Sequence, residues 1–221
     1  RAIGLAFTGD KLPAEEAERI GLIWRCVDDA ALAETTRALA LRLAAMPVRE
    51  WLAEAKDPRW KKPYTELTYL PMQEVLKYLR ANGYKTFIVT GGGQDFVRVY
   101  SQAVYGIPPE QVVGTAGGTS YGYAKDGKPF LTKTPKLLLN DNNAGKPEGI
   151  HLMIGRRPNV AFGNSTGDMQ MLQWTKAGEG ARLSMILLHD DAKREYAYGP
   201  AQGLPVAQVH AYAAAAGTHV A

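Results

Sequence analysis

Helix-like and strand-like segments alternate through the middle of the chain, and this alternation limits the fold more than any other feature. Residues 71–82 carry apolar side chains at helical spacing, and an apolar, strand-like run follows at residues 84–90. A second succession of helix and strand covers residues 145–155 and 159–162. Strands separated by helices favour an α/β protein, so we predict a mostly parallel, three-layer, Rossmann-like sheet with helices on both faces.

The N-terminal part has a different rhythm and predicts a small helical segment. Proline, acidic residues and a closing glycine mark a short helix over residues 14–20, and a longer helix is expected over residues 28–45. The composition changes after Pro47, and an alanine-rich tail closes the sequence. We therefore predict three parts, which are residues 1–47, residues 48–205 and residues 206–221.

Composition and charge exclude several classes of protein. The 221 residues include 26 lysines and arginines and 22 aspartates and glutamates, for a formal net charge of +4. The densest basic run, residues 59–62, is too short for a nucleic-acid surface. No apolar stretch reaches the ~18 residues of a membrane span, and the single cysteine, Cys26, permits no intrachain disulfide. We expect a cytoplasmic protein that binds neither nucleic acid nor membrane.

A glycine-rich strand end indicates an anion site. Residues 87–93 read FIVTGGG, an apolar strand that ends in a hydroxyl and three residues without side chains. Thr90 can donate its hydroxyl to an anion, and Gly91 and Gly92 let backbone N–H groups approach one closely. The same residues would also suit a tight strand-to-helix turn without a ligand.

Two further polar positions follow in chain order. Lys146 stands at an expected helix start, where the helix dipole disfavours a cation unless an anion lies in front of it. A solvated surface lysine is the alternative. Asn164 and Asp168 lie in the turn after the next strand, and their oxygen atoms suit magnesium. That turn would equally serve as a helix cap, and the two roles are compatible.

The order of these features, with the sequence between them, resembles the phosphoserine-phosphatase-like branch of the haloacid dehalogenase superfamily. The runs that carry the resemblance are YLRANGYKT at residues 78–86, VYGIPPEQVVG at residues 104–114 and IGRRP at residues 154–158. The resemblance extends from about residue 48 to residue 204 and implies a magnesium-dependent hydrolase of phosphate esters or related substrates.

The resemblance also implies a role for each polar position. Thr90 would bind the phosphate with help from Gly91 and Gly92, and Lys146 would neutralise the phosphoryl group. Asn164 and Asp168 would surround the magnesium ion, which offsets charge during phosphoryl transfer.

One part of that family pattern is absent. The family's first motif is a strand ending in Asp-x-Asp-x-Thr, which supplies the nucleophile and the general acid/base, and no Asp-x-Asp occurs in this sequence. Asp141 has the wrong place in the chain order. Residues 5–23 instead resemble the C-terminal part of enoyl-CoA hydratase/isomerase (crotonase) proteins, and this resemblance runs to about Pro47. The sequence therefore indicates a fusion of two fragments joined near residues 46–48.

The missing motif leaves two ways to complete the sheet. Exposed sheet edges tend to pair with other strands, which suggests a homo-oligomer formed through the edge. Alternatively, the apolar run at residues 3–10 fills the vacancy and brings Asp10 in as a catalytic carboxylate. The expected function is a weak or atypical hydrolase of a small phosphate-containing molecule. The alternative is an inactive fusion remnant that binds phosphate-like anions or only self-associates.

Overall fold

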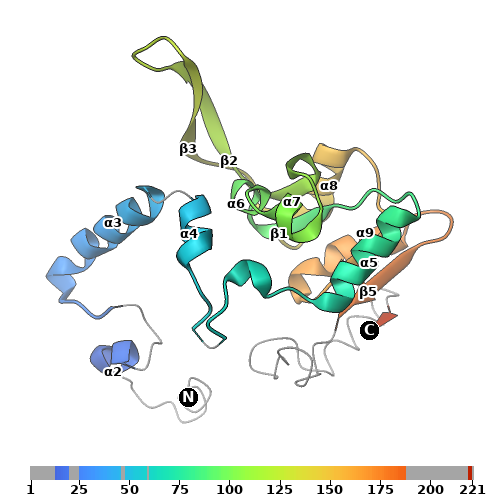
Figure 1. Cartoon of the computed structure of the whole chain (residues 1–221), viewed down its shortest axis with the longest axis horizontal. Helices are drawn as coiled ribbons and strands as arrows, with labels where there is room; N and C mark the ends of the chain where they lie inside the picture. Colours follow the sequence, from blue (N-terminus) through green and yellow to red (C-terminus); the bar gives the residue numbers. More distant parts are fainter. Residues whose placement is uncertain (1–12, 20–24, 46–47, 59, 188–218, 221) are drawn as a thin grey trace. The chain divides into compact units, whose positions relative to one another are not determined.

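The computed structural model describes residues 13–19, 25–45, 48–58, 60–187 and 219–220 (Figure 1). The chain divides into two compact units, Arg1–Ala55 and Lys56–Ala221. Among the described helices, none is long and apolar enough to cross a membrane. The division into residues 1–47, 48–205 and 206–221 stays a prediction.

The first unit is helical where it is described. Its helices are α2 (Ala14–Arg19), α3 (Asp29–Ala45) and α4 (Val48–Glu54). Each has an acidic residue in its first turn, where a negative charge is favoured by the positive end of the helix dipole. The bounds of α2 and α3 agree to within one residue with the helices expected over residues 14–20 and 28–45.

The second unit alternates helices and strands. Its helices are α5 (Leu70–Ala81), α6 (Gln94–Arg98), α7 (Ser101–Tyr105), α8 (Gly145–Ile154) and α9 (Met169–Lys176), with short 3₁₀ turns η1 (Tyr64–Glu66), η2 (Pro109–Gln111) and η3 (Thr166–Asp168). Its strands are β1 (Ile88–Gly93), β2 (Val112–Tyr123), β3 (Pro129–Leu139), β4 (Val160–Gly163), β5 (Leu183–Ile186) and β6 (His219–Val220).

These strands form two separate three-stranded sheets. In the first, β1 and β2 are parallel, and β2 and β3 are antiparallel. In the second, β5 lies between β4 and β6, and both pairings are parallel. The α/β class is confirmed. The described strands form two small sheets, however, one of mixed pairing and one parallel, and they do not show the single, mostly parallel sheet that we predicted.

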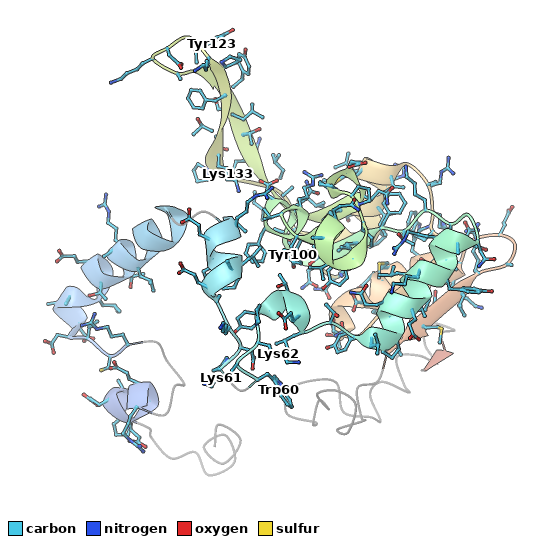
Figure 2. All side chains as sticks on the ribbon, viewed as in Figure 1. Trp60, Lys61, Lys62, Tyr100, Tyr123 and Lys133 are labelled. Atoms are coloured by element: carbon cyan, nitrogen blue, oxygen red, sulfur yellow. The ribbon has the colours of Figure 1, made fainter. Side chains whose placement is uncertain are left out.

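The first part of β2 and its remainder pair with different strands. It pairs with β1 as far as Thr115, and from Ala116 onward it pairs with β3 in a two-stranded ribbon. Figure 2 shows Tyr123 near the tip of this ribbon and Lys133 nearer its base. The rings of Tyr121 and Tyr123 meet edge to face with centroids 5.2 Å apart. Most side chains of the ribbon are exposed, so the core of the unit lies elsewhere.

The core lies where α8 and α9 pack on β4 and β5. Ile150 of α8, Leu172 of α9 and Ile186 of β5 are almost completely buried, and Val89 of β1 packs against the same cluster. Complete burial of an aliphatic side chain of this size contributes roughly 1.5–3 kcal/mol. The cluster therefore fixes β4 and the start of α8 close to the end of β1.

Candidate functional site

Three chain segments converge where β1 and β4 end. They are the strand end at residues 90–93, the loop at residues 140–145 and the turn at residues 164–168. The N–H of Asn143 donates to the carbonyl of Gly167 at 3.1 Å, which joins the loop to the turn. The Nζ of Lys146 donates to the carbonyl of Val89 at 2.8 Å, which joins α8 to β1. These bonds bring together polar residues that are far apart in the sequence.

Lys146 and Asp168 form a buried ion pair. The Nζ of Lys146 lies 2.7 Å from Oδ1 of Asp168, and each side chain is only 8% exposed. Burial removes both charges from water, so such a pair is stable only when each group has further hydrogen-bond partners. Lys146 has a second acceptor in the carbonyl of Val89. It is therefore not the solvated surface lysine that the sequence left as an alternative.

The second carboxylate oxygen of Asp168 closes the turn after β4. Oδ2 accepts hydrogen bonds from the N–H groups of Asn164 (2.9 Å) and Ser165 (3.1 Å) and from the Ser165 hydroxyl (3.2 Å). Asp168 and Ser165 together make a capping box. Gly163 makes room for this arrangement, since a Cβ there would lie 2.5 Å from the Cβ of Asp168. The capping role of the turn is thus present in the structure.

The oxygen atoms of this turn, as arranged, are poorly suited to bind a magnesium ion directly. Oδ2 of Asp168 accepts hydrogen bonds from the Asn164 N–H and from two donors of Ser165, and Oδ1 lies against the Lys146 ammonium group. The remaining lone pair of Oδ1 is therefore next to a positive charge. The Asn164 side chain is exposed to solvent. The described part of the chain contains no group of three or more His, Cys, Asp or Glu side chains that could hold a metal ion. A metal ion bound to Oδ1 of Asp168 would lie beside the Lys146 ammonium group and be repelled by it.

The backbone at the end of β1 is exposed to solvent. Gly91, Gly92 and Gly93 are exposed. The Oγ1 of Thr90 accepts the Gly92 N–H at 3.0 Å, which leaves the hydroxyl proton of Thr90 available for an anion. Sequence reasoning missed the contribution of Gly114 on the neighbouring strand, where a Cβ would lie 3.0 Å from Cγ2 of Thr90. Thr90 is therefore packed closely against a glycine of the neighbouring strand.

Asp141 is the site residue that sequence reasoning set aside. Its side chain is fully buried, and neither carboxylate oxygen has a hydrogen-bond partner of normal geometry. Burial raises the pKa of Asp141 to about 6, against the opposing effects of the Lys146 charge and the Thr90 backbone N–H. A Cβ at Gly149 would lie 2.6 Å from Oδ1 of Asp141, so α8 closes over the carboxyl group. One sequence feature could have identified Asp141 as a site residue, namely its position in the loop directly before the helix that carries Lys146.

The raised pKa of Asp141 predicts a pH-dependent stability difference. The folded-state pKa of about 6 exceeds the ordinary value of 3.8, so the fold favours the protonated carboxyl, and this preference is lost as the pH rises from 4 to 6. We expect the Asp141→Asn variant to be more stable than the wild type at pH 7.5, with a free energy of unfolding higher by on the order of 1–3 kcal/mol. This difference in stability should disappear near pH 4. Urea unfolding of both proteins at the two pH values measures this. A gap that is equal at both would contradict it.

The structure places the sequence-predicted residues as follows. Lys146 and Asp168 are in direct contact, and Thr90, Gly91 and Gly92 lie at the adjoining strand end. Asn164 contacts Asp168 through its backbone N–H, while its side chain faces solvent. Asp10, the catalytic candidate, lies outside the described residues.

Comparisons with known proteins find two partial likenesses. No family model matches the chain. The chain is 51% identical over 47 residues to 1,2-epoxyphenylacetyl-CoA isomerase from Escherichia coli, which is 21% of this chain and 18% of that protein. It is also similar to the crystal structure of a phosphoserine phosphohydrolase-like protein from Francisella tularensis subsp. tularensis, with a TM-score of 0.41 and 18% identity, over 81% of this chain and 75% of that one.

Both resemblances named from the sequence therefore recur as likenesses to known proteins. The chain spans less than a fifth of the length of the isomerase. At that coverage, and at this TM-score, neither likeness assigns a role to any residue of this chain.

Proposed function

We propose that this chain binds the phosphate group of a small phosphate ester where β1 ends, and that it hydrolyses the ester slowly. The observation that carries the proposal is the buried ion pair of Lys146 and Asp168, which lies directly beside an exposed, glycine-rich strand end. A fixed ammonium group beside the exposed glycine backbone of a strand end is the kind of environment that a phosphate dianion requires. Thr90 adds a hydroxyl donor at the same place.

The remaining parts of the phosphatase hypothesis belong to this proposal. They are a single, mostly parallel sheet of the haloacid dehalogenase type, a requirement for magnesium and a homo-oligomer formed through a sheet edge. No step of the reaction is assigned to magnesium, because the described residues include no group of three or more His, Cys, Asp or Glu side chains that could hold a metal ion. Asn164, the other proposed ligand, has its side chain in solvent.

A second candidate function is phosphate binding without turnover. This candidate is favoured because the carboxylates in the three converging segments are either buried or already hydrogen-bonded. Asp141 is fully buried, and both oxygens of Asp168 are engaged by donors, so these segments present no carboxylate that could attack a phosphoryl group. Hydrolysis would then need a carboxylate from elsewhere, such as Asp10, or a water molecule.

Thr90→Val tests the site without disturbing the ion pair. Valine keeps the shape of threonine and removes the hydroxyl, so we expect the affinity for inorganic phosphate to fall about tenfold, the value of one hydrogen bond to a charged group. Thr119→Val, on the exposed ribbon, is the matched control and should bind phosphate like the wild type. Isothermal titration calorimetry measures both affinities. Equal affinities of the two variants would refute the assignment of Thr90.

Turnover of an aryl phosphate, with and without magnesium, separates the two candidates. Slow turnover that Thr90→Val reduces supports the hydrolase. Phosphate binding without detectable turnover supports the binding protein.

A further inference from the structure

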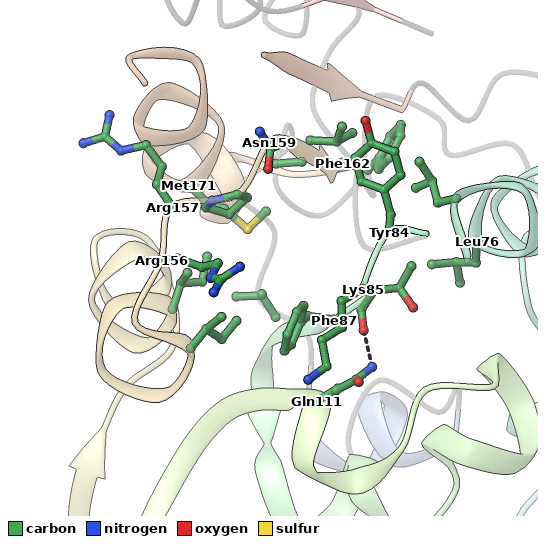
Figure 3. Close-up of a pocket in the computed structure, with 18 of the residues that line it drawn as sticks. Leu76, Tyr84, Lys85, Phe87, Gln111, Arg156, Arg157, Asn159, Phe162 and Met171 are labelled. Carbon is green, nitrogen blue, oxygen red and sulfur yellow. Dashed lines mark hydrogen bonds between the residues drawn. The ribbon is translucent and has the colours of Figure 1, made fainter. Parts of the chain in front are cut away.

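A cavity of about 760 Å³ lies between the two sheets of the second unit. Its wall includes Val89 from β1 and Val160 and Phe162 from β4, together with apolar side chains from α5, α8 and α9. Figure 3 shows Phe87, Phe162 and Met171 around it. Charged side chains, among them Lys85, Glu110 and Arg157, also line it. Each sheet therefore contributes one edge strand to the same space.

β4 has one side without a neighbouring strand. It pairs only with β5 among the described strands. Asn159 and Gly163 direct their carbonyls to the β5 side, where they accept the N–H groups of Leu183 (3.0 Å) and Leu187 (2.8 Å). Because the direction of the backbone groups alternates along a strand, the N–H and C=O groups of two other residues point away from β5. These residues are Val160 and Phe162, and both line the cavity.

β1 is likewise the edge strand of its sheet. Its Val89 lines the cavity, and the carbonyl of Val89 accepts a hydrogen bond from the Lys146 ammonium group. The ends of β1 and β4 meet at Lys146, which contacts both Val89 and Asp168. Lys85 and Arg156, which precede the two strands, line the cavity as well. The two edge strands therefore run in the same direction along it.

We propose that the cavity is an acceptor site for one extended peptide strand, inserted between β1 and β4 and parallel to both. β4 has four residues and β1 has six, so the inserted segment would be of similar length. Because apolar side chains of three helices line the wall, the segment would be uncharged and apolar throughout, as strands buried on both faces are. It would join the two sheets into one. This strand site does not depend on the proposed phosphate chemistry.

The unpaired backbone groups favour a peptide over another apolar ligand. A fatty acid would fill the volume but leave the N–H and C=O groups of Val160 and Phe162 without partners, which is costly in a buried place. A peptide strand satisfies both edges at once, as in other cases of strand addition. Lys85 and Arg156 stand where the inserted strand would begin, so they disfavour a free, positively charged N-terminus. An N-acetylated peptide is therefore the appropriate probe.

The test uses the full chain and an N-acetylated, C-terminally amidated peptide with the sequence of residues 2–7, AIGLAF. Amide hydrogen exchange is followed by NMR. With saturating peptide, we expect exchange at Val160 and Phe162 to slow by about tenfold or more, and exchange at Ile186, in the central strand of its sheet, to stay the same. Rates at Val160 and Phe162 that do not change with peptide overturn the proposal.

Two variants of β4 make the test specific. Val160→Pro removes the N–H that faces the cavity but none that faces β5, and proline is tolerated at such edge positions. It should weaken peptide binding at least tenfold, whereas Val160→Ala, which keeps the N–H, should retain it. Equal binding by both variants would exclude backbone pairing.

Two further ligands complete the test. A control peptide with Leu5→Asp and Phe7→Asp should not bind, and binding as tight as that of the parent peptide contradicts an apolar strand site. Dodecanoate should leave the exchange rates unchanged. If it slows the same amides while the peptide does not, the cavity holds an acyl ligand and the strand proposal fails.

Discussion

Lys146→Met is expected to lower the free energy of unfolding by about 3–5 kcal/mol, the usual result of removing one partner from a buried ion pair. Methionine keeps the length and apolar stem of lysine, so the loss reports the unpaired charge of Asp168, whose side chain is 8% exposed. Urea unfolding at pH 7.5 measures it. Adding Asp168→Asn should recover at least about 1 kcal/mol, because the buried charge is then removed as well.

Lys133→Met provides the matched control for this prediction. Lys133 also pairs with an aspartate, Asp95, at 3.2 Å, but its side chain is 76% exposed and that of Asp95 is 56% exposed. Exposed pairs contribute about 0–1 kcal/mol, so Lys133→Met should unfold almost like the wild type. Equal losses for the two lysine variants would mean that the pair of Lys146 and Asp168 is not buried in solution.

Gly145→Ala is expected to have the second-largest effect, a loss of about 3 kcal/mol or more. A Cβ at Gly145 would lie 1.8 Å from the carbonyl oxygen of Asn140, a backbone atom that cannot turn aside. The loop at residues 140–145 would have to move, and Lys146 would move with it. The variant should therefore lose phosphate affinity along with stability, as measured by urea unfolding and calorimetry.

Gly117→Ala separates the steric effect from the general effect of replacing glycine. The nearest atom to a Cβ at Gly117 is the carbonyl oxygen of Lys136 at 3.9 Å, an ordinary contact. Alanine there should leave stability unchanged or raise it slightly, because it reduces the freedom of the unfolded chain. A Gly145→Ala protein as stable as Gly117→Ala would show that the loop adapts without cost.

The local features of the fold could be predicted from the sequence. The apolar spacing over residues 71–82 gave α5, and the glycine that follows α8 marked its end, because Gly155 adopts a positive φ of 75°. The family resemblance implied that Lys146 and Asp168 belong to one site, but their ion pair was not predicted, since the two are 22 positions apart and no local pattern links them. Their burial was not predicted, because it depends on how α8 packs against β1.

The arrangement of strands and the state of the carboxylates could not be predicted in the same way. Strand runs such as residues 84–90 show that strands exist but not which strands pair, so the two small sheets were expected as one. Asp141 was judged by its position relative to a nucleophile motif, whereas its raised pKa comes from burial under Gly149. The three hydrogen bonds to Oδ2 of Asp168 likewise depend in part on Ser165, a neighbour to which the sequence analysis assigned no role.

The most direct measurement of the central claim is an NMR titration of the full chain with inorganic phosphate, repeated on Thr90→Val. We predict that amide signals of Thr90, Gly91 and Gly92 shift with saturable dependence on phosphate in the wild type, and shift at about tenfold higher concentrations in the variant. Glycines of the ribbon, such as Gly122, should stay unchanged. Shifts that spare the end of β1, or that spread evenly over the exposed lysines, would contradict a phosphate site at this strand end.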